Sequence, residues 1–211
     1  MKILQYALPR SGSSLLKQIL RELELDEHIH SHEFVGDCEW DMVGTVRDFR
    51  DVFISHWRIW FGQIEDGKLI NIPTLSQISD MLKTVQVKID VLNTYEEKYK
   101  GRVLWLRYED FYNNHDYIFD KLEKFLGLTI SREKREEIKE NTSLEANRKR
   151  QDSVKIVDKK RIFNNVDGDI HANHISPIDP EQGYWKDIVK PEHYEIIEGF
   201  FAKELKSWGY K

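Results

Sequence analysis

The segment that most constrains the fold of this chain is residues 3–23, near its N-terminus. An apolar run stops at Pro9, Gly12 follows among three serines, and apolar residues then recur at helical spacing as far as Leu23. The pattern predicts a buried strand, a tight loop and a helix. The first N–H groups of a helix have no acceptor within it, and the helix dipole adds positive charge there, so such a loop suits an anion. Because serine is also a favoured helix cap, the pattern by itself equally fits an ordinary strand-to-helix turn.

Residues 9–14, called the first loop below, carry side chains suited to an oxyanion. Small side chains let a ligand approach the backbone closely, and the serine hydroxyls add donors. Arg10 adds a fixed cation whose forked guanidinium can meet two oxygens at once. We therefore predict that the first loop binds a phosphate or a similar tetrahedral oxyanion.

Strands are also predicted at residues 28–34, where polar and apolar residues alternate, and at the apolar segments 41–46 and 103–108. Helices are predicted at 48–57, 73–100, 117–127, 131–141 and 191–205, and irregular structure at 59–71 and 148–183. Alternating strands and helices indicate a single α/β domain over residues 1–211, with a central parallel sheet covered by helices on both faces. In such a fold, ligands bind beyond the carboxyl ends of the strands.

The composition excludes several classes of protein. The 211-residue chain has a formal charge of −5, which argues against a general nucleic-acid binder. Cys38 is the single cysteine, so neither an intrachain disulfide nor a cysteine metal cluster can form. No apolar run approaches the length of a membrane span, and no signal peptide precedes the first strand, so we expect a cytoplasmic protein.

A second candidate site follows the strand at residues 41–46. Arg47 comes directly after that strand, and Ser55 lies eight residues later, two turns into the next helix. By itself, an arginine at a strand end is more often a surface charge. However, the first loop, Arg47 and Tyr108 all fall at carboxyl ends of predicted strands, so we expect them to converge at one edge of the sheet.

Three segments in the first quarter of the chain resemble the cytosolic and Golgi sulfotransferases. LPRSGSSL, at residues 8–15, resembles the 5′-phosphosulfate loop of that family, commonly written YPKSGTTWL. VRDFRDVFIS, at residues 46–55, resembles its 3′-phosphate motif, in which a serine follows an arginine by eight positions. His-Ser-His, at residues 30–32, resembles the Lys-Thr-His segment that carries the catalytic base of the family.

Three later segments support the resemblance. Residues 106–111, LRYEDF, are similar to the YEDM strand end, whose tyrosine lies by the adenine. Residues 141–145, NTSLE, resemble the TSF segment that also contacts the nucleotide, and residues 183–186, GYWK, resemble a Gly-Asp-Trp-Lys segment near the C-terminus. All six segments occur in the order found in the family.

The resemblance implies a three-layer fold like that of the P-loop nucleotide hydrolases. It also implies that the sulfuryl group of 3′-phosphoadenosine 5′-phosphosulfate (PAPS) is transferred to a hydroxyl or amine of a small-molecule or carbohydrate acceptor. The product of the donor is 3′,5′-bisphosphoadenosine (PAP), and the resemblance implies no metal ion. His32 would take the acceptor proton, and Arg10 would stabilise charge on the leaving phosphate. The residues that it places at the donor are Arg10, Ser11, Gly12, Ser13, Ser14, Leu15, Arg47, Ser55, Tyr108, Thr142 and Leu144.

The chain departs from the family pattern at several of these positions. Arg10 replaces the usual lysine, and Leu15 and Leu144 stand where an adenine-stacking Trp and a Phe are common. The Arg-Lys-Gly that normally grips the 3′-phosphate is absent, since residues 178–180 read Ile-Asp-Pro. The residues that could replace this grip are Lys159, Lys160, Arg161, His171 and His174.

Other readings of the sequence stay open. His30 competes with His32 as the base, and His56 is a weaker candidate. A P-loop kinase would need a second glycine followed by lysine, whereas Gly12 is the single glycine of the loop and Lys17 lies too far along the helix. A nucleotide-binding module without activity is a third alternative. The sequence does not identify the acceptor. It does not determine the oligomeric state either, and a homodimer is one of the alternatives.

Overall fold

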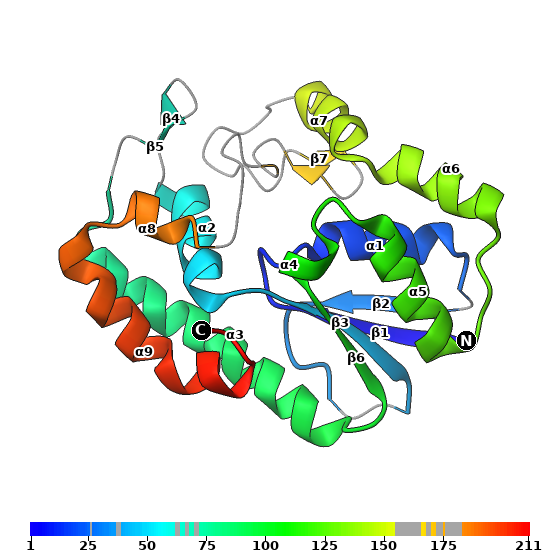
Figure 1. The fold of residues 1–211 in the computed structure, drawn as a ribbon, viewed down its shortest axis with the longest axis horizontal. Helices are drawn as coiled ribbons and strands as arrows, with labels where there is room; N and C mark the ends of the chain where they lie inside the picture. Colours follow the sequence, from blue (N-terminus) through cyan, green and yellow to red (C-terminus); the bar gives the residue numbers. More distant parts are fainter. Residues whose placement is uncertain are drawn as a thin grey trace.

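The computed structural model describes residues 1–25, 27–36, 39–61, 64–65, 68–69, 72–154, 166–167, 170–171, 175 and 183–211. A four-stranded sheet in the order β2-β1-β3-β6 lies at its centre (Figure 1). These strands are β1 (Lys2–Ala7), β2 (Glu27–Ser31), β3 (Asp41–Val46) and β6 (Val103–Arg107). All three pairs of neighbours run parallel, so the residues that follow the four strands share one edge of the sheet.

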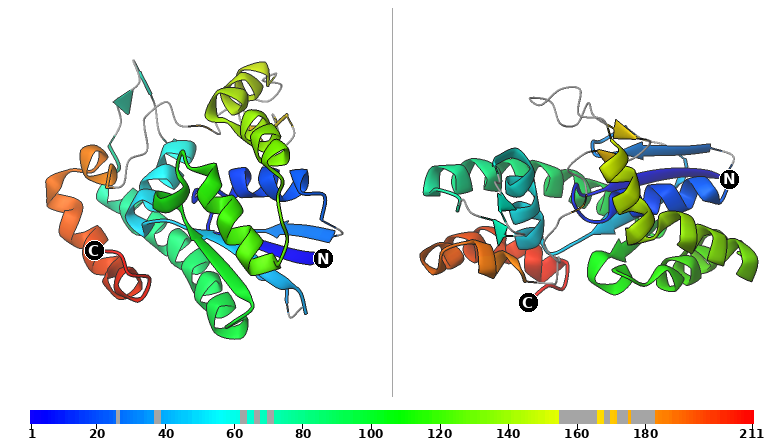
Figure 2. Two further views of the ribbon diagram at one scale, coloured as in Figure 1. Left: turned by 45° about the vertical axis from the view of Figure 1, so that its right-hand side comes forward. Right: turned by 90° about the horizontal axis from the view of Figure 1, so that it is seen from above.

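The sheet separates two hydrophobic cores, because successive side chains of a strand point to opposite faces. On β3, Met42 and Val46 belong to one core and Val43 to the other. Figures 1 and 2 show helices on both sides of the sheet. The first core packs under α2 (Phe49–Phe61), α3 (Leu75–Lys98) and α9 (Tyr194–Ser207), and the second under α1 (Ser13–Glu22), α5 (His115–Leu126) and α6 (Arg132–Thr142). The predicted parallel sheet with helices on both faces is confirmed.

The remaining elements are short. They comprise α4 (Tyr108–Phe111), α7 (Leu144–Ser153), α8 (Trp185–Ile188), the 3₁₀ helix η2 (Pro191–His193) and two hairpins, β4 (Ile64–Glu65) with β5 (Lys68–Leu69) and β7 (Val166–Asp167) with β8 (Ile170–His171). Several helix ends carry the expected signals: Thr74 completes a capping box with Gln77, and Gly127 ends α5 in a left-handed conformation. None of the described helices is long and apolar enough to cross a membrane.

Three predicted boundaries are wrong. Helix α2 continues through residues 59–61, and α7 reaches Ser153, although both stretches were expected to be irregular. The helix passes the predicted end at residue 57 because Trp57 and Arg58 are buried by tertiary packing, and the turn formed by residues 59–61 continues from them toward solvent. Strand β2 ends at Ser31, short of the predicted residue 34, so His32 is the first residue beyond the strand.

Candidate active site

The first loop has a backbone that only a few residue types can adopt. Gly12, the N-cap of α1, has a φ of 85° and makes no side-chain cap bond, and Arg10 has a φ of 70°. A Cβ on Gly12 would lie 2.6 Å from Cζ of Phe111, so glycine is required there for space as well as for conformation. The loop therefore presents the N-terminus of α1 without a side chain across it.

Ser11 is fully buried, and its hydroxyl makes contacts within the protein, while its contact with the donor stays a prediction. Its Oγ donates to the carbonyl oxygen of Leu8 at 2.5 Å and lies 2.7 Å from Oγ1 of Thr45, while its N–H donates to the carbonyl of Leu8. Ser11 thus fastens the loop to β3. Ser13 and Ser14, the first two residues of α1, and Leu15 after them stay predicted donor contacts.

Three predicted donor residues from two motifs meet directly. The Nε of Arg10 donates to the Oγ of Ser55 at 3.1 Å, and Nη1 of Arg47 lies 3.4 Å from the carbonyl oxygen of Arg10. Arg47 and Ser55 are 4% and 5% exposed. The structure therefore brings the first loop and the Arg47 turn together at the carboxyl edge of the sheet, as the sequence predicted.

Two tyrosine rings hold the Arg47 guanidinium in position. Its central carbon lies 4.3 Å from the ring centroid of Tyr108 and 5.5 Å from that of Tyr184. Tyr108 was predicted to lie at the donor, and it begins α4 directly after β6. Tyr184 was not predicted as a site residue, although it lies within the GYWK segment.

Arg58 is a further residue that the sequence did not single out. It is 2% exposed and lies in α2, one helical turn after Ser55. The pKa of Arg10 is lowered to about 9, first by burial and next by the positive charge of Arg58, with Arg47 adding to the effect. The charges of two further guanidiniums, from other parts of the chain, therefore act on Arg10, an arrangement that favours a multiply charged anion.

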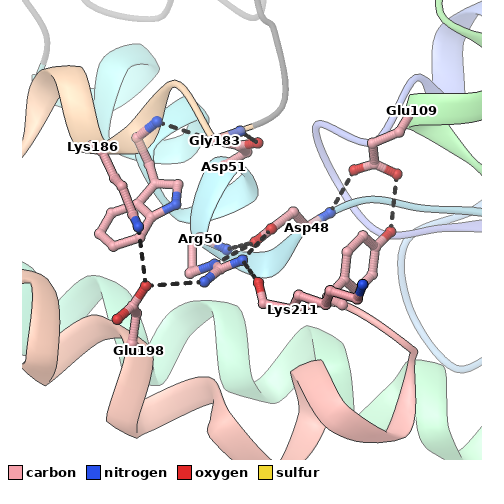
Figure 3. Close-up of polar contacts among 10 residues, drawn as sticks. Asp48, Arg50, Asp51, Glu109, Gly183, Lys186, Glu198 and Lys211 are labelled. Carbon is pink, nitrogen blue, oxygen red and sulfur yellow. Dashed lines mark hydrogen bonds and ion pairs between the residues drawn. The ribbon is translucent and has the colours of Figure 1, made fainter.

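A network of polar contacts fixes the turn that carries Arg47, as Figure 3 shows. The Nε and Nη2 of Arg50 donate to the two carboxylate oxygens of Asp48 at 3.0 and 2.7 Å, and its Nη1 donates to Glu198 at 3.2 Å. Asp48 also accepts the N–H of Arg50, as expected of a cap, and its own N–H donates to Glu109 at 3.0 Å. Because Glu198 of α9 and Glu109 of α4 bind the residues that follow Arg47, the backbone that carries the Arg47 side chain is fixed.

Asp51 fastens the GYWK segment to α2. Its Oδ2 accepts the N–H of Gly183 at 2.9 Å (Figure 3), and its Oδ1 accepts the N–H of Trp185 at 3.1 Å. Tyr184 lies between these two anchored residues, which holds its ring against Arg47. Asp51 is fully buried, and burial raises its pKa to about 6.

Replacing Asp51 by alanine is expected to remove a pH dependence from the stability of the protein. The pKa of Asp51 is about 6 in the folded protein, above the ordinary value of 3.8. Between these two pH values, the Asp51 carboxyl therefore keeps its proton in the folded protein but has lost it in the unfolded chain. The contribution of Asp51 therefore falls as the pH rises from about 4 to about 6, by about 3 kcal/mol in all. Urea unfolding at several pH values should show wild type losing stability relative to Asp51→Ala across this interval.

The matched control is Asp187→Ala, which removes an exposed carboxylate from the same segment. This variant should keep the wild-type dependence on pH. Parallel stability profiles for wild type and Asp51→Ala would contradict the prediction.

His32 lies at the same edge, with a hydrogen bond that selects its tautomer. Its Nδ1 is 2.7 Å from the carbonyl oxygen of Ala7, which can only accept, so Nδ1 carries the hydrogen and Nε2 of the neutral ring is left with a lone pair. Burial lowers the pKa of His32, and the charges of Lys88, Lys17 and Arg10 lower it further. The imidazole is therefore neutral at pH 7 and lies within electrostatic reach of Arg10.

The two competing histidines are also close to His32. The rings of His30, in β2, and His32, just beyond it, lie edge to face with centroids 4.6 Å apart. The pKa of His56 is lowered to about 4, mainly by burial and then by the charges of Arg10, His32 and Lys88. All three histidines thus belong to one neighbourhood, and the identity of the base stays a prediction.

The last two predicted donor residues lie at the junction of α6 and α7. The hydroxyl of Thr142 donates to the carbonyl of Ile138 at 2.7 Å and lies 3.0 Å from Nε2 of His115, and Leu144 is 38% exposed. Among the described residues, no hydrogen bond or ion pair joins them to Arg10 or Arg47. Their contact with the nucleotide stays a prediction.

Most of the residues proposed to replace the missing Arg-Lys-Gly lie outside the part of the chain that the structure describes. Lys159, Lys160, Arg161 and His174 lie outside the described residues, as do residues 178–180. His171 ends the short strand β8.

With this geometry established, the chain can be compared with known proteins. A sequence model of the sulfotransferase domain matches residues 39–209. The chain belongs to the sulfotransferase-domain family. The match confirms the predicted family and the class of enzyme, and it includes Arg47 and Ser55. It begins after the first loop and His32, so their roles depend on the geometry described above.

Solved structures share the fold of this sulfotransferase over almost its whole length. A mouse sulfotransferase, SULT7A1, complexed with PAP has a TM-score of 0.67 at 16% identity, over 97% of this chain and 84% of that one. Two structures of retinol dehydratase, one with androsterone and inactive cofactor PAP and one with retinol and PAP, have TM-scores of 0.65 and 0.68 at 13% and 15% identity. They cover 97% of this chain and 80% and 81% of theirs. A comparison with curated proteins found no match.

Proposed function

We propose that this sulfotransferase uses PAPS as its donor and transfers the sulfuryl group to a hydroxyl or amine by in-line displacement. The observation that carries the proposal is the meeting of Arg10, Arg47 and Ser55 at the carboxyl edge of the sheet, beside the neutral imidazole of His32. A donor with phosphates at both the 5′ and 3′ positions suits a site that gathers several cations. The similar folds that hold PAP support the same donor.

In this proposal each part of the site acts on a different group. The first loop and the N-terminus of α1 receive the 5′-phosphosulfate, and Arg10 stabilises the charge that develops on the leaving phosphate. Arg47 and Ser55 bind the 3′-phosphate, a group that PAPS has and ATP lacks. The Nε2 of His32 accepts the proton of the acceptor as the acceptor oxygen or nitrogen attacks sulfur.

The proposed acceptor is a small molecule, in keeping with the androsterone and retinol held by similar folds. Trp60 and Phe61, at the end of α2, are 59% and 48% exposed and offer apolar surface two and three residues beyond Arg58. Trp57, by contrast, is fully buried in the core. A screen of phenols, alcohols, amines and carbohydrates with donor carrying radiolabelled sulfate would identify the acceptor class.

Thermal unfolding with different nucleotides tests the choice of donor. PAP at a hundred times its Kd should stabilise the protein by about 2.7 kcal/mol, whereas ATP with magnesium should have little effect. A larger shift with ATP and magnesium would favour a P-loop kinase and would overturn the proposal. Binding of PAP without transfer to any acceptor in the screen would indicate a nucleotide-binding module without activity.

A further inference from the structure

Arg58 has a position that a surface arginine would not occupy. It is 2% exposed and is one of the largest fully buried side chains of the described structure. A guanidinium with little water around it interacts strongly with an anion, because the local dielectric constant is low. The burial of Arg58 therefore suits its guanidinium to binding an anion, which its place in the sequence does not indicate.

Helix geometry directs Arg58 toward the residues proposed to bind the 3′-phosphate. Ser55 and Arg58 are three positions apart in α2, so they are neighbours on one side of the helix. Long side chains in helices lean toward the helix N-terminus, which here is the direction of Ser55. Ser55 in turn accepts a hydrogen bond from Arg10 at 3.1 Å.

The charges of three guanidiniums, those of Arg10, Arg47 and Arg58, all act on the hydroxyl of Tyr184. Tyr184 is 7% exposed, and burial raises the pKa of its hydroxyl. The charges of Arg47, Arg58 and Arg10 oppose this rise. Its backbone is held between the two N–H groups that donate to Asp51. One fixed tyrosine therefore lies within electrostatic reach of guanidiniums from the first loop, the Arg47 turn and the last turn of α2.

We propose that Arg58 is a third guanidinium of the 3′-phosphate site, beside Arg47 and Ser55, and that it sets the preference for 3′-phosphorylated nucleotides. The inference depends on the proposed function, because it concerns the same donor. In this proposal, a residue of α2 makes a cationic contact with the 3′-phosphate that the sequence analysis had expected from residues 159–174.

Calorimetric titration with PAP and with adenosine 5′-phosphate, which lacks the 3′-phosphate, tests the proposal. Arg58→Ala should weaken PAP binding by roughly 10- to 100-fold, the range expected for lost hydrogen bonds to a charged group, and change the affinity for adenosine 5′-phosphate by less than about threefold. Arg58→Lys should recover part of the affinity for PAP, because it restores the charge without the fork. Arg132→Ala, which removes an exposed arginine of α6, should match wild type for both ligands.

Equal weakening of both ligands by Arg58→Ala would overturn the inference, and so would unchanged binding of PAP. Either result leaves the proposed function intact as long as wild type prefers PAP. Equal affinity of wild type for both ligands would instead contradict the proposed function. If Arg58→Ala does not unfold cooperatively, Arg58→Gln takes its place, since it keeps much of the length and removes the charge.

Discussion

Replacing Arg47 by alanine is expected to weaken PAP binding by roughly 10²- to 10³-fold and to change the affinity for adenosine 5′-phosphosulfate, which lacks the 3′-phosphate, by less than about threefold. The large effect follows from the environment of the side chain. Arg47 is 4% exposed, and its guanidinium contacts the ring of Tyr108 and lies near that of Tyr184. A charge already desolvated and oriented before the ligand arrives loses little entropy on binding. Calorimetric titration of both nucleotides measures the two affinities.

Arg107 supplies the matched control for Arg47. It ends β6 in register with Val46, the residue before Arg47, but its guanidinium lies 4.2 Å from the ring centroid of Tyr210 and its Nη1 3.4 Å from the carbonyl of Trp208. Arg107→Ala should therefore lower the melting temperature without changing the preference for the 3′-phosphate. If the native protein bound PAP and adenosine 5′-phosphosulfate equally well, the assignment of Arg47 would fail.

The parts of the site that the sequence predicted depend on local patterns. Strands β1, β3 and β6 are short, mainly apolar segments, β2 alternates polar residues with an apolar one, and the first loop and Arg47 follow β1 and β3. Because the ends of parallel strands share an edge, a list of strand ends is enough to predict which residues converge. Asp48, directly before α2, is a residue type that commonly caps helices, and its carboxylate accepts the N–H of Arg50.

The parts that the sequence could not predict depend on contacts between distant segments. Asp51 binds Gly183 and Trp185, more than a hundred positions away, and no periodicity in either segment predicts that pairing. Arg58 looked like a polar residue near the end of a helix, and only the packing of α2 against the core shows that it is buried. Ser11 fitted an anion loop by composition, yet its hydroxyl is used within the protein.

Replacing His32 by alanine is expected to lower kcat for sulfuryl transfer by roughly 10²- to 10⁴-fold while leaving the affinity for PAP close to wild type. The neutral ring has its Nε2 lone pair available, because Nδ1 donates to Ala7. Since burial and the charges of Lys88, Lys17 and Arg10 lower the pKa of His32 from 6.5, kcat/KM of wild type should rise with pH, with the midpoint of the rise below pH 6.5. Initial rates with an acceptor from the screen, measured across pH, give both results.

His30→Ala and His56→Ala are the controls that distinguish a proton acceptor from a nearby ring. Both rings lie close to His32, so either variant could disturb packing and lower the melting temperature. Neither should lose more than about tenfold in kcat if His32 is the base, since neither removes the proton acceptor. The decisive comparison is therefore the kcat of the three variants at saturating donor. Turnover retained by His32→Ala, together with a loss in one of the other two variants, would assign the base to that residue instead.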